Sequence, residues 1–119
     1  MSDFDPEELP TFAFVVPDQC HDGHDCGDDV VDDWAWSQIE PILDSASYGS
    51  GKVLLVVIYD EDQPVPNLLI APTATAGAIT DSVGSHASLL KTVELALGLP
   101  VLDQGELPDA PSLRPSANI

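Results

Sequence analysis

The sequence predicts an α/β layered fold built around a mostly parallel sheet. Three observations support this fold class. The segments follow one another as strand, helix, strand, strand and helix, which is typical of layered α/β proteins. The run "KVLLVVIY" (52–59) is apolar at nearly every position, as expected of a parallel strand covered on both faces. At 119 residues with 44% hydrophobic content, the chain is long enough to build one core.

The first half of the chain is predicted to contain a strand and a helix. Residues 1–10 are acidic, contain two prolines and show no period, so we expect a flexible lead-in. The aromatic and β-branched run "TFAFVV" (11–16) predicts a short strand. Asp28 or Asp29 is then a suitable N-cap for a helix of about four turns. The apolar positions that define its buried face are Val31, Ala35, Ile39 and Ile42.

The second half is predicted to contain two strands and a helix. The small, polar segment 45–52 is typical of a turn, and it leads into the strand described above. A short apolar run at 67–72 predicts another strand. Ser85 is the expected N-cap of the last helix and Gly98 its stop signal, whereas residues 101–119 are expected to form an irregular tail that docks loosely or not at all. The apolar stripe of that helix is Leu89, Leu90, Val93, Ala96 and Leu97. We therefore expect one domain at 11–100 between the lead-in and the tail.

The charge of the chain restricts its partners. There are 21 acidic residues and three basic ones, which gives a formal net charge of −18. Such a field makes nucleic acid and anionic membranes poor partners, and it would repel a phosphate group unless bound cations reversed the local potential. The plainest interpretation is that most of these carboxylates only aid solubility. The longest apolar run, "VLLVVIY", is too short to span a bilayer.

Two clusters of chemically reactive residues follow predicted strands. The stretch "PDQCHDGHDC" (17–26) holds both cysteines and two of the three histidines, and "DED" (60–62) follows the long apolar run. Ligands of open α/β sheets gather at the carboxyl ends of strands. This placement is the main argument from the residues for a site. Because "DED" would serve equally well as a charged turn, its spacing alone is not specific.

The histidine stretch has several interpretations. Zinc could be held by four ligands within seven residues, but structural zinc sites usually draw pairs from separated segments. The two cysteines could instead form a disulfide if the chain is exported, or stay reduced in the cytoplasm. No serine lies in a G-x-S-x-G turn, and "GSGK" (49–52) precedes a strand rather than a helix, so neither motif indicates a nucleophile or a phosphate loop. The four zinc candidates are Cys20, His21, His24 and Cys26.

Several blocks occur in an order that resembles a known family. They are "FAFVVPDQCHDGHDC", "DDW", "ILDSASY", "VLLVVIYDED", "NLLIAP", "SHASLLKTVELALGLPVL" and "APSLRP". Together they resemble the C-terminal half of the bacterial phosphoesterase family, which includes acid phosphatases, phosphatidylinositol-3-phosphatase-like proteins and phospholipases C of the alkaline-phosphatase-like superfamily. The resemblance implies a partial three-layer α/β/α sandwich, a divalent metal ion at the sheet edge and hydrolysis of phosphate mono- or diesters.

The resemblance also implies roles for individual residues. Asp60 and Glu61 match the acidic metal motif, with Asp62 as a further candidate, and His24 and His86 match histidines that face the phosphate or the metal. A carboxylate can fix a cation, and a histidine can hold a phosphoryl oxygen or protonate a leaving alkoxide. Asp22 and Asp25 match acids of the same loop without an assigned role. On this resemblance Cys20 and Cys26 form a disulfide that braces the loop and hold no metal.

The chain also departs from the family in ways that affect the predicted function. Family members are about twice as long, and the part without a counterpart here carries the hydroxyl nucleophile, which we do not find. We therefore expect a truncated member, with a missing-half partner or a homo-oligomer as its assembly. The alternative is a non-catalytic acidic domain that binds cations or a partner. The family is typically secreted, whereas this sequence shows no signal peptide, so we expect a cytoplasmic protein or a fragment of an exported one.

Overall fold

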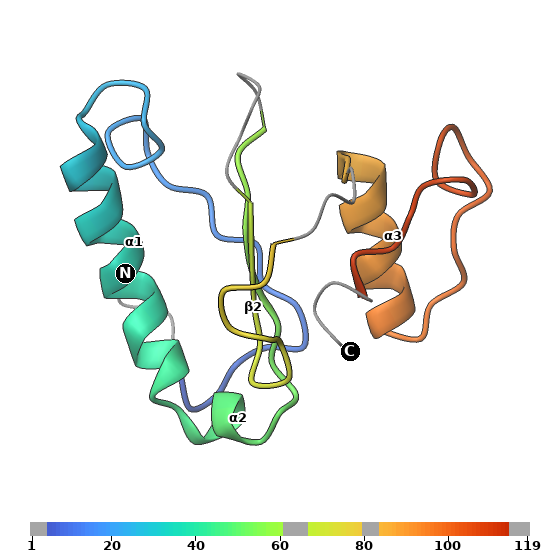
Figure 1. Ribbon diagram of the computed structural model, residues 1–119, viewed down its shortest axis with the longest axis horizontal. Helices are drawn as coiled ribbons and strands as arrows, with labels where there is room; N and C mark the ends of the chain where they lie inside the picture. Colours follow the sequence, from blue (N-terminus) through green and yellow to red (C-terminus); the bar gives the residue numbers. More distant parts are fainter. Residues whose placement is uncertain (1–4, 61–66, 80–83, 115–119) are drawn as a thin grey trace. The chain divides into compact units, whose positions relative to one another are not determined.

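The computed structural model describes residues 5–60, 67–79 and 84–114. Its elements follow in the order α1, α2, β1, β2 and α3 (Figure 1). The chain divides into two compact units, Met1–Val53 and Leu54–Ile119. None of the helices in the described residues is long and apolar enough to cross a membrane.

The main element of the first unit is helix α1, Asp28–Leu43. This confirms the helix predicted from its apolar spacing, and Ile42 of that face is buried. The predicted N-cap is wrong, because Gly27 holds that position and makes no side-chain cap. Asp28 and Asp29 lie instead in the first turn, where negative charge is favourable beside the positive end of the helix dipole.

A second, short helix follows where the sequence predicts a turn. Helix α2 spans Ala46–Gly49, and the Ser45 hydroxyl caps it by accepting a hydrogen bond from the Tyr48 backbone N–H at 3.1 Å. The carboxylate of Glu7 accepts from the Ala46 N–H at 3.3 Å, and the Glu7 carbonyl accepts from the Ser47 hydroxyl at 3.3 Å. Part of the expected flexible lead-in is therefore fastened to α2.

The segment predicted as the first strand, 11–16, has no regular secondary structure. Within the described residues, no backbone hydrogen bond joins it to a neighbouring strand. Its large side chains are exposed, with Phe14 at 70% and Val16 at 71% of their full accessible surface. A strand needs a hydrogen-bonding neighbour, so strand propensity alone leaves this segment extended and unpaired.

The second unit contains a two-stranded sheet. Strand β1, Leu55–Val57, pairs antiparallel with β2, Leu68–Ile70, and the register places Leu55 opposite Ile70. Both strands are shorter than the apolar runs that predict them, and β1 is only half-buried. This pair neither confirms nor excludes a larger parallel sheet, so the layered α/β fold stays a prediction.

Helix α3, His86–Ala96, confirms both of its predicted ends. The Ser85 hydroxyl accepts from the Ser88 N–H at 3.2 Å, and Gly98 adopts a left-handed φ of 67° after the last turn. The buried positions of α3 are not those of the predicted apolar stripe. They are Ser88, Thr92 and Glu94, while Leu90 and Leu97 are exposed.

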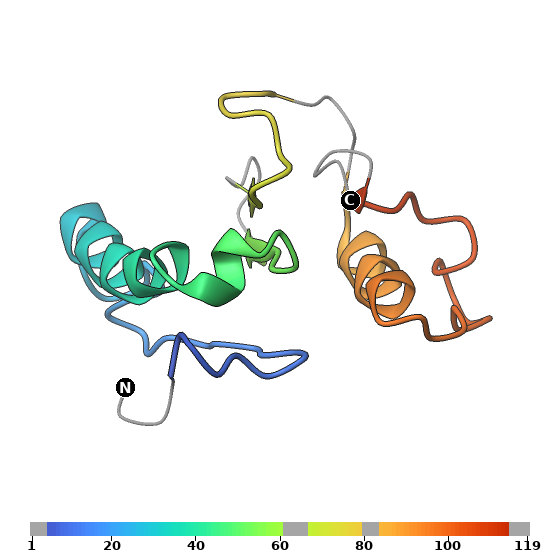
Figure 2. The same ribbon diagram turned by 90° about the horizontal axis from the view of Figure 1, so that it is seen from below.

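The C-terminal segment explains why α3 buries a polar face. Lys91 donates from Nζ to the carbonyls of Pro108 and Ala110 at 2.9 and 2.8 Å, and the Leu113 N–H donates to the Thr92 hydroxyl at 2.8 Å. Leu107 and Ala110 are buried. The tail therefore docks on α3, as Figure 2 shows, and the expectation of a loose tail is wrong for its described part.

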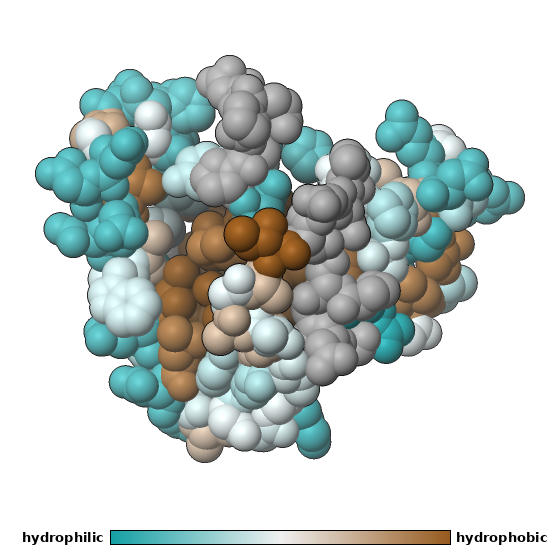
Figure 3. Space-filling view, viewed as in Figure 1, coloured by the Kyte–Doolittle hydropathy of each residue, from teal (hydrophilic) through white to brown (hydrophobic). Residues whose placement is uncertain are grey.

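Few apolar side chains are buried in the described residues. They are Ile42, Ala71, Leu107 and Ala110. Large apolar side chains such as Phe12 and Trp36, each 53% exposed, contact solvent instead. Figure 3 shows apolar residues reaching the surface beside a strongly hydrophilic region. Several large apolar side chains of the described residues are therefore exposed to solvent.

Candidate functional site

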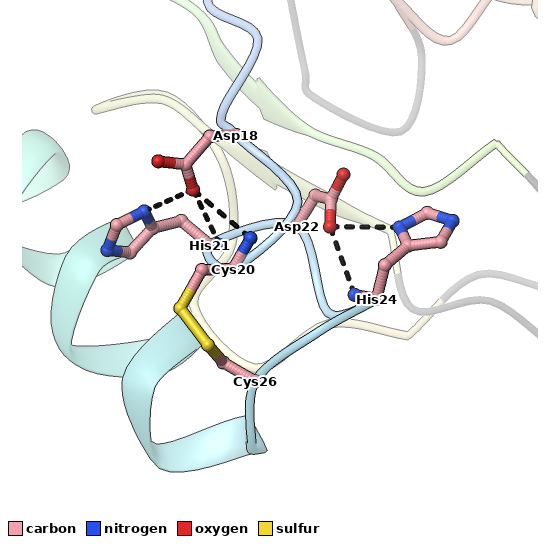
Figure 4. Close-up of polar contacts among 6 residues, drawn as sticks. All are labelled: Asp18, Cys20, His21, Asp22, His24 and Cys26. Atoms are coloured by element: carbon pink, nitrogen blue, oxygen red, sulfur yellow. Dashed lines mark hydrogen bonds and ion pairs between the residues drawn. A yellow bond between two sulfur atoms is a disulfide. The ribbon is translucent and has the colours of Figure 1, made fainter.

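The chemically richest part of the structure is a closed loop, residues 18–26, which we call the histidine loop. A disulfide joins Cys20 to Cys26, whose Cα atoms lie 4.7 Å apart (Figure 4). The Asp25 N–H donates to the Gln19 carbonyl at 2.8 Å across the same loop, and Gly23 supplies the left-handed φ of 99° that its turn requires. The predicted disulfide is confirmed. The four-ligand zinc site is wrong, because each sulfur is bonded to the other.

The first histidine of the loop is held by an aspartate. His21 and Asp18 form a hydrogen bond between Nδ1 and Oδ1 at 2.6 Å. The same Oδ1 accepts from the backbone N–H groups of Cys20 and His21, both at 3.1 Å. On its other side the His21 ring contacts Trp34 of α1, with 5.5 Å between the ring centroids and 33° between the planes. The carboxylate, the loop backbone and the indole together fix this imidazole.

The second histidine repeats the pattern. His24 and Asp22 form a hydrogen bond between Nδ1 and Oδ1 at 2.9 Å, and the same oxygen accepts from the His24 N–H at 3.0 Å. The His24 side chain is 53% exposed, compared with 32% for His21. Figure 4 shows the two rings on opposite sides of the loop. The loop therefore presents two imidazoles in different directions.

These hydrogen bonds stabilise both carboxylates in their ionised form. The pKa of Asp18 is lowered chiefly by its side-chain hydrogen bond with His21. The pKa of Asp22 is lowered chiefly by the backbone N–H of His24. An ionised carboxylate can only accept hydrogen bonds, so Nδ1 of each imidazole must be the donor. In the neutral ring this leaves the lone pair on Nε2.

The other predicted site residues are spread over the chain. Asp60 is exposed and follows β1, and His86 is exposed as the first residue of α3. Both belong to the second unit, whereas His24 belongs to the first. Asp25 is an exposed part of the histidine loop. The predictions for Glu61 and Asp62 lie outside the described residues.

The predicted metal site has little support from the residues that the structure describes. Among residues 5–60, 67–79 and 84–114, no group of three or more His, Cys, Asp or Glu side chains is placed to hold a metal ion. Asp60 alone supplies at most two oxygens, and a hard cation such as Mg²⁺ or Ca²⁺ needs about six ligands or more. The described residues therefore do not fit a metal ion by themselves.

The Asp18–His21 pair is the feature that the sequence analysis missed. The sequence pattern indicates only a zinc-ligand role for His21 and no role for Asp18. Its signal in the sequence is "DQCHDGH", in which a D-x-x-H spacing is followed directly by a D-x-H spacing. The aspartate of each pair closes a short turn through its side chain, which brings the carboxylate back to the imidazole.

Comparison with known proteins identifies the class of enzyme to which this chain is similar. The curated relatives that it matches are named as phosphatases, which are a class of hydrolase. This similarity supports a phosphatase family for the chain. No family model matches the chain. A comparison with solved structures gave no significant match.

Three of these relatives show the extent of the similarity. A probable acid phosphatase of Kluyveromyces lactis is 29% identical over 85% of this chain and 26% of its own length. An acid phosphatase of Aspergillus fumigatus is 29% identical over 81% of this chain and 23% of its own length. The phosphatidylinositol-3-phosphatase of Mycobacterium tuberculosis is 30% identical over 77% of this chain and 31% of its own length. The chain thus matches a quarter to a third of these relatives.

Proposed function

We propose that this chain carries part of the active site of a phosphoesterase that hydrolyses phosphate mono- or diesters. The observation that carries the proposal is the histidine loop, a covalently closed loop that holds two imidazoles by their Nδ1 atoms. Carboxylate-oriented imidazoles are suited to proton transfer and to hydrogen bonding with phosphoryl oxygens. The similarity to proteins named acid phosphatase and phosphatidylinositol-3-phosphatase supports the choice of a phosphate ester as substrate.

Within this proposal, His24 and His86 contact the phosphoryl group or the leaving group. Asp22 holds the His24 ring by its Nδ1 atom and so fixes the orientation of the imidazole. The ring N–H groups of the histidines are suited to hydrogen-bond a phosphoryl oxygen in a chain of net charge −18. The nucleophile is not among the residues that we assign.

A divalent cation is a further part of the proposal. Asp60 with Glu61, and Asp62 as a third acid of the same turn, would contribute oxygen ligands, and the cation would supply positive charge against the phosphate. The described residues do not complete such a site, so the remaining ligands would come from other parts of the active protein. No catalytic step is assigned to the cation.

Hydrolysis of an aryl phosphate and of an aryl phosphodiester by the full chain tests the proposal. Rates are measured with Mg²⁺, Mn²⁺, Ca²⁺ or Zn²⁺ and with a chelator, on the parent chain, His24→Gln and Asp60→Asn. Asp33→Asn is the matched control, because Asp33 is an exposed aspartate of α1 outside the proposed site. We expect the hydrolysis rate of both site variants to fall by at least about 100-fold, whereas the control should have the rate of the parent chain. Equal rates in all four chains would refute the proposal.

The uncovered apolar surface favours a second candidate function, a partner-binding acidic domain. Phe14 and Val16 are mostly exposed, and few apolar side chains are buried in the described residues. A missing-half partner or a second copy of the chain would cover this surface. Size-exclusion chromatography with light scattering distinguishes the candidates: a stable monomer that hydrolyses phosphate esters argues against an obligatory partner.

A further inference from the structure

His21 is held by contacts on two sides of its ring. Its Nδ1 atom lies 2.6 Å from Asp18 Oδ1. The Trp34 indole restrains the His21 ring as well, and the side chain is 32% exposed. This packing comes from α1, the longest helix of the first unit. A functional side chain needs such support to keep one geometry.

The bonding of His21 determines which nitrogen remains for chemistry. Asp18 accepts the Nδ1 proton, so the neutral ring carries its lone pair on Nε2. Among residues 5–60, 67–79 and 84–114, no hydrogen bond engages Nε2 of His21. The ring is partly exposed on the side of the loop away from His24 (Figure 4). An oriented, accessible basic nitrogen paired with a carboxylate is the arrangement of a general base.

We propose that His21 is a catalytic base, and that Asp18 positions it. In this step Nε2 of His21 takes the proton from a water or hydroxyl group as its oxygen bonds to the phosphorus of a phosphate ester. The ester P–O bond breaks, the leaving alkoxide takes a proton from solvent, and the Asp18 carboxylate stabilises the imidazolium. The inference rests on the proposed phosphoesterase function and adds a residue to which the resemblance gives no role.

The alternative is that Asp18 and His21 only shape the loop, and two substitutions separate these roles. His21→Asn keeps a side-chain donor close to the position of Nδ1 but has no counterpart of Nε2. Asp18→Asn keeps an oxygen for the loop N–H groups but can also donate to Nδ1, which would move the ring proton to Nε2. An oriented histidine with the wrong tautomer can no longer act as the base.

Two measurements on the full chain test the proposal, with Asp33→Asn as the control. Nitrogen-15 NMR of the His21 ring should show the proton of the neutral ring on Nδ1 in the parent chain and on Nε2 in Asp18→Asn. In aryl phosphate hydrolysis, His21→Asn and Asp18→Asn should each lower kcat by about 100- to 10,000-fold with little change in KM. The control should match the parent chain in both measurements.

The outcomes distinguish this inference from the proposed function. If His21→Asn keeps the parent kcat while His24→Gln loses it, His21 is not the base although the chain is a phosphoesterase. A proton on Nε2 in the parent chain would also overturn the inference, whatever the activity. A parent chain that hydrolyses no phosphate ester would overturn both.

Discussion

Breaking the disulfide should destabilise the first unit by an amount that its loop length sets. The Cys20–Cys26 bond spans a sequence separation of six. The loop-closure entropy that a bond of this span removes from the unfolded chain corresponds to about 2 kcal/mol at 25 °C. The double variant Cys20→Ser/Cys26→Ser should therefore lose about 2 kcal/mol of unfolding free energy. With a typical urea m value of about 2 kcal/mol/M, the unfolding midpoint should fall by about 1 M.

Tryptophan fluorescence can follow this change selectively. Both tryptophans of the chain, Trp34 and Trp36, lie on α1 in the first unit, and Trp34 contacts the histidine loop through His21. Urea titrations should be compared for the parent chain with and without a dithiol reductant. The reduced parent should approach the double variant, and the reductant should leave the variant unchanged. An oxidised parent with the same midpoint as the variant would show that the loop is held by its internal hydrogen bonds and not by the disulfide.

Two further predictions concern the tail and the pH dependence of the histidine loop. Thr92→Val should lower the unfolding free energy of the second unit by about 1–3 kcal/mol, because the Leu113 N–H loses its acceptor. Hydrogen exchange of the backbone amides at 107–114 should be faster in this variant than in the parent chain. The exposed control Thr75→Val should not change it. The lowered pKa values of Asp18 and Asp22 should stabilise the folded loop above the unfolded value of about 3.9, and this contribution should be lost as the pH falls through the folded values. Urea midpoints between pH 6 and pH 3 measure the effect, and Asp18→Asn/Asp22→Asn should flatten the change.

The parts of the fold that were predicted correctly depend on local sequence. Helix α3 is defined by the Ser85 cap and the Gly98 stop, which act within a few residues of the helix ends. Helix α2 was missed because its N-terminal backbone is satisfied partly by Glu7, 39 residues away from Ala46. A contact of that sequence separation leaves no periodic signal in the segment "ASYG".

The docking of the tail was missed for a related reason. The contacts that hold it are hydrogen bonds from Lys91 and to Thr92, and neither residue belongs to an apolar pattern. Sequence reasoning selected the apolar stripe as the buried face of α3, because burial of apolar surface is the usual driving force. Thr92 and Glu94 are buried instead, because backbone N–H groups of the tail are their partners. Such pairing can be recognised only when the two segments are seen together.

In the histidine loop, the disulfide was predicted correctly but the partners of the histidines were not. The sequence left zinc and a disulfide as alternatives, the resemblance favoured the disulfide, and the structure pairs cysteine with cysteine and each histidine with an aspartate. The resemblance selected His24, and the Asp18–His21 pair became visible only from the distance between Asp18 and His21. Side-chain pairing within a tight loop depends on its turns, which composition does not determine.

The acidity of the chain has two different physical consequences. Asp32 and Asp33 on α1 are exposed, and they add to a field that repels phosphate. Asp18 and Asp22 are also charged, but each accepts hydrogen bonds from backbone N–H groups and from an imidazole. These carboxylates therefore orient two imidazoles by their Nδ1 atoms. The same residue type thus has two roles in this chain: on α1 it contributes surface charge, and in the histidine loop it fixes the direction of a ring that can exchange a proton with a phosphate ester.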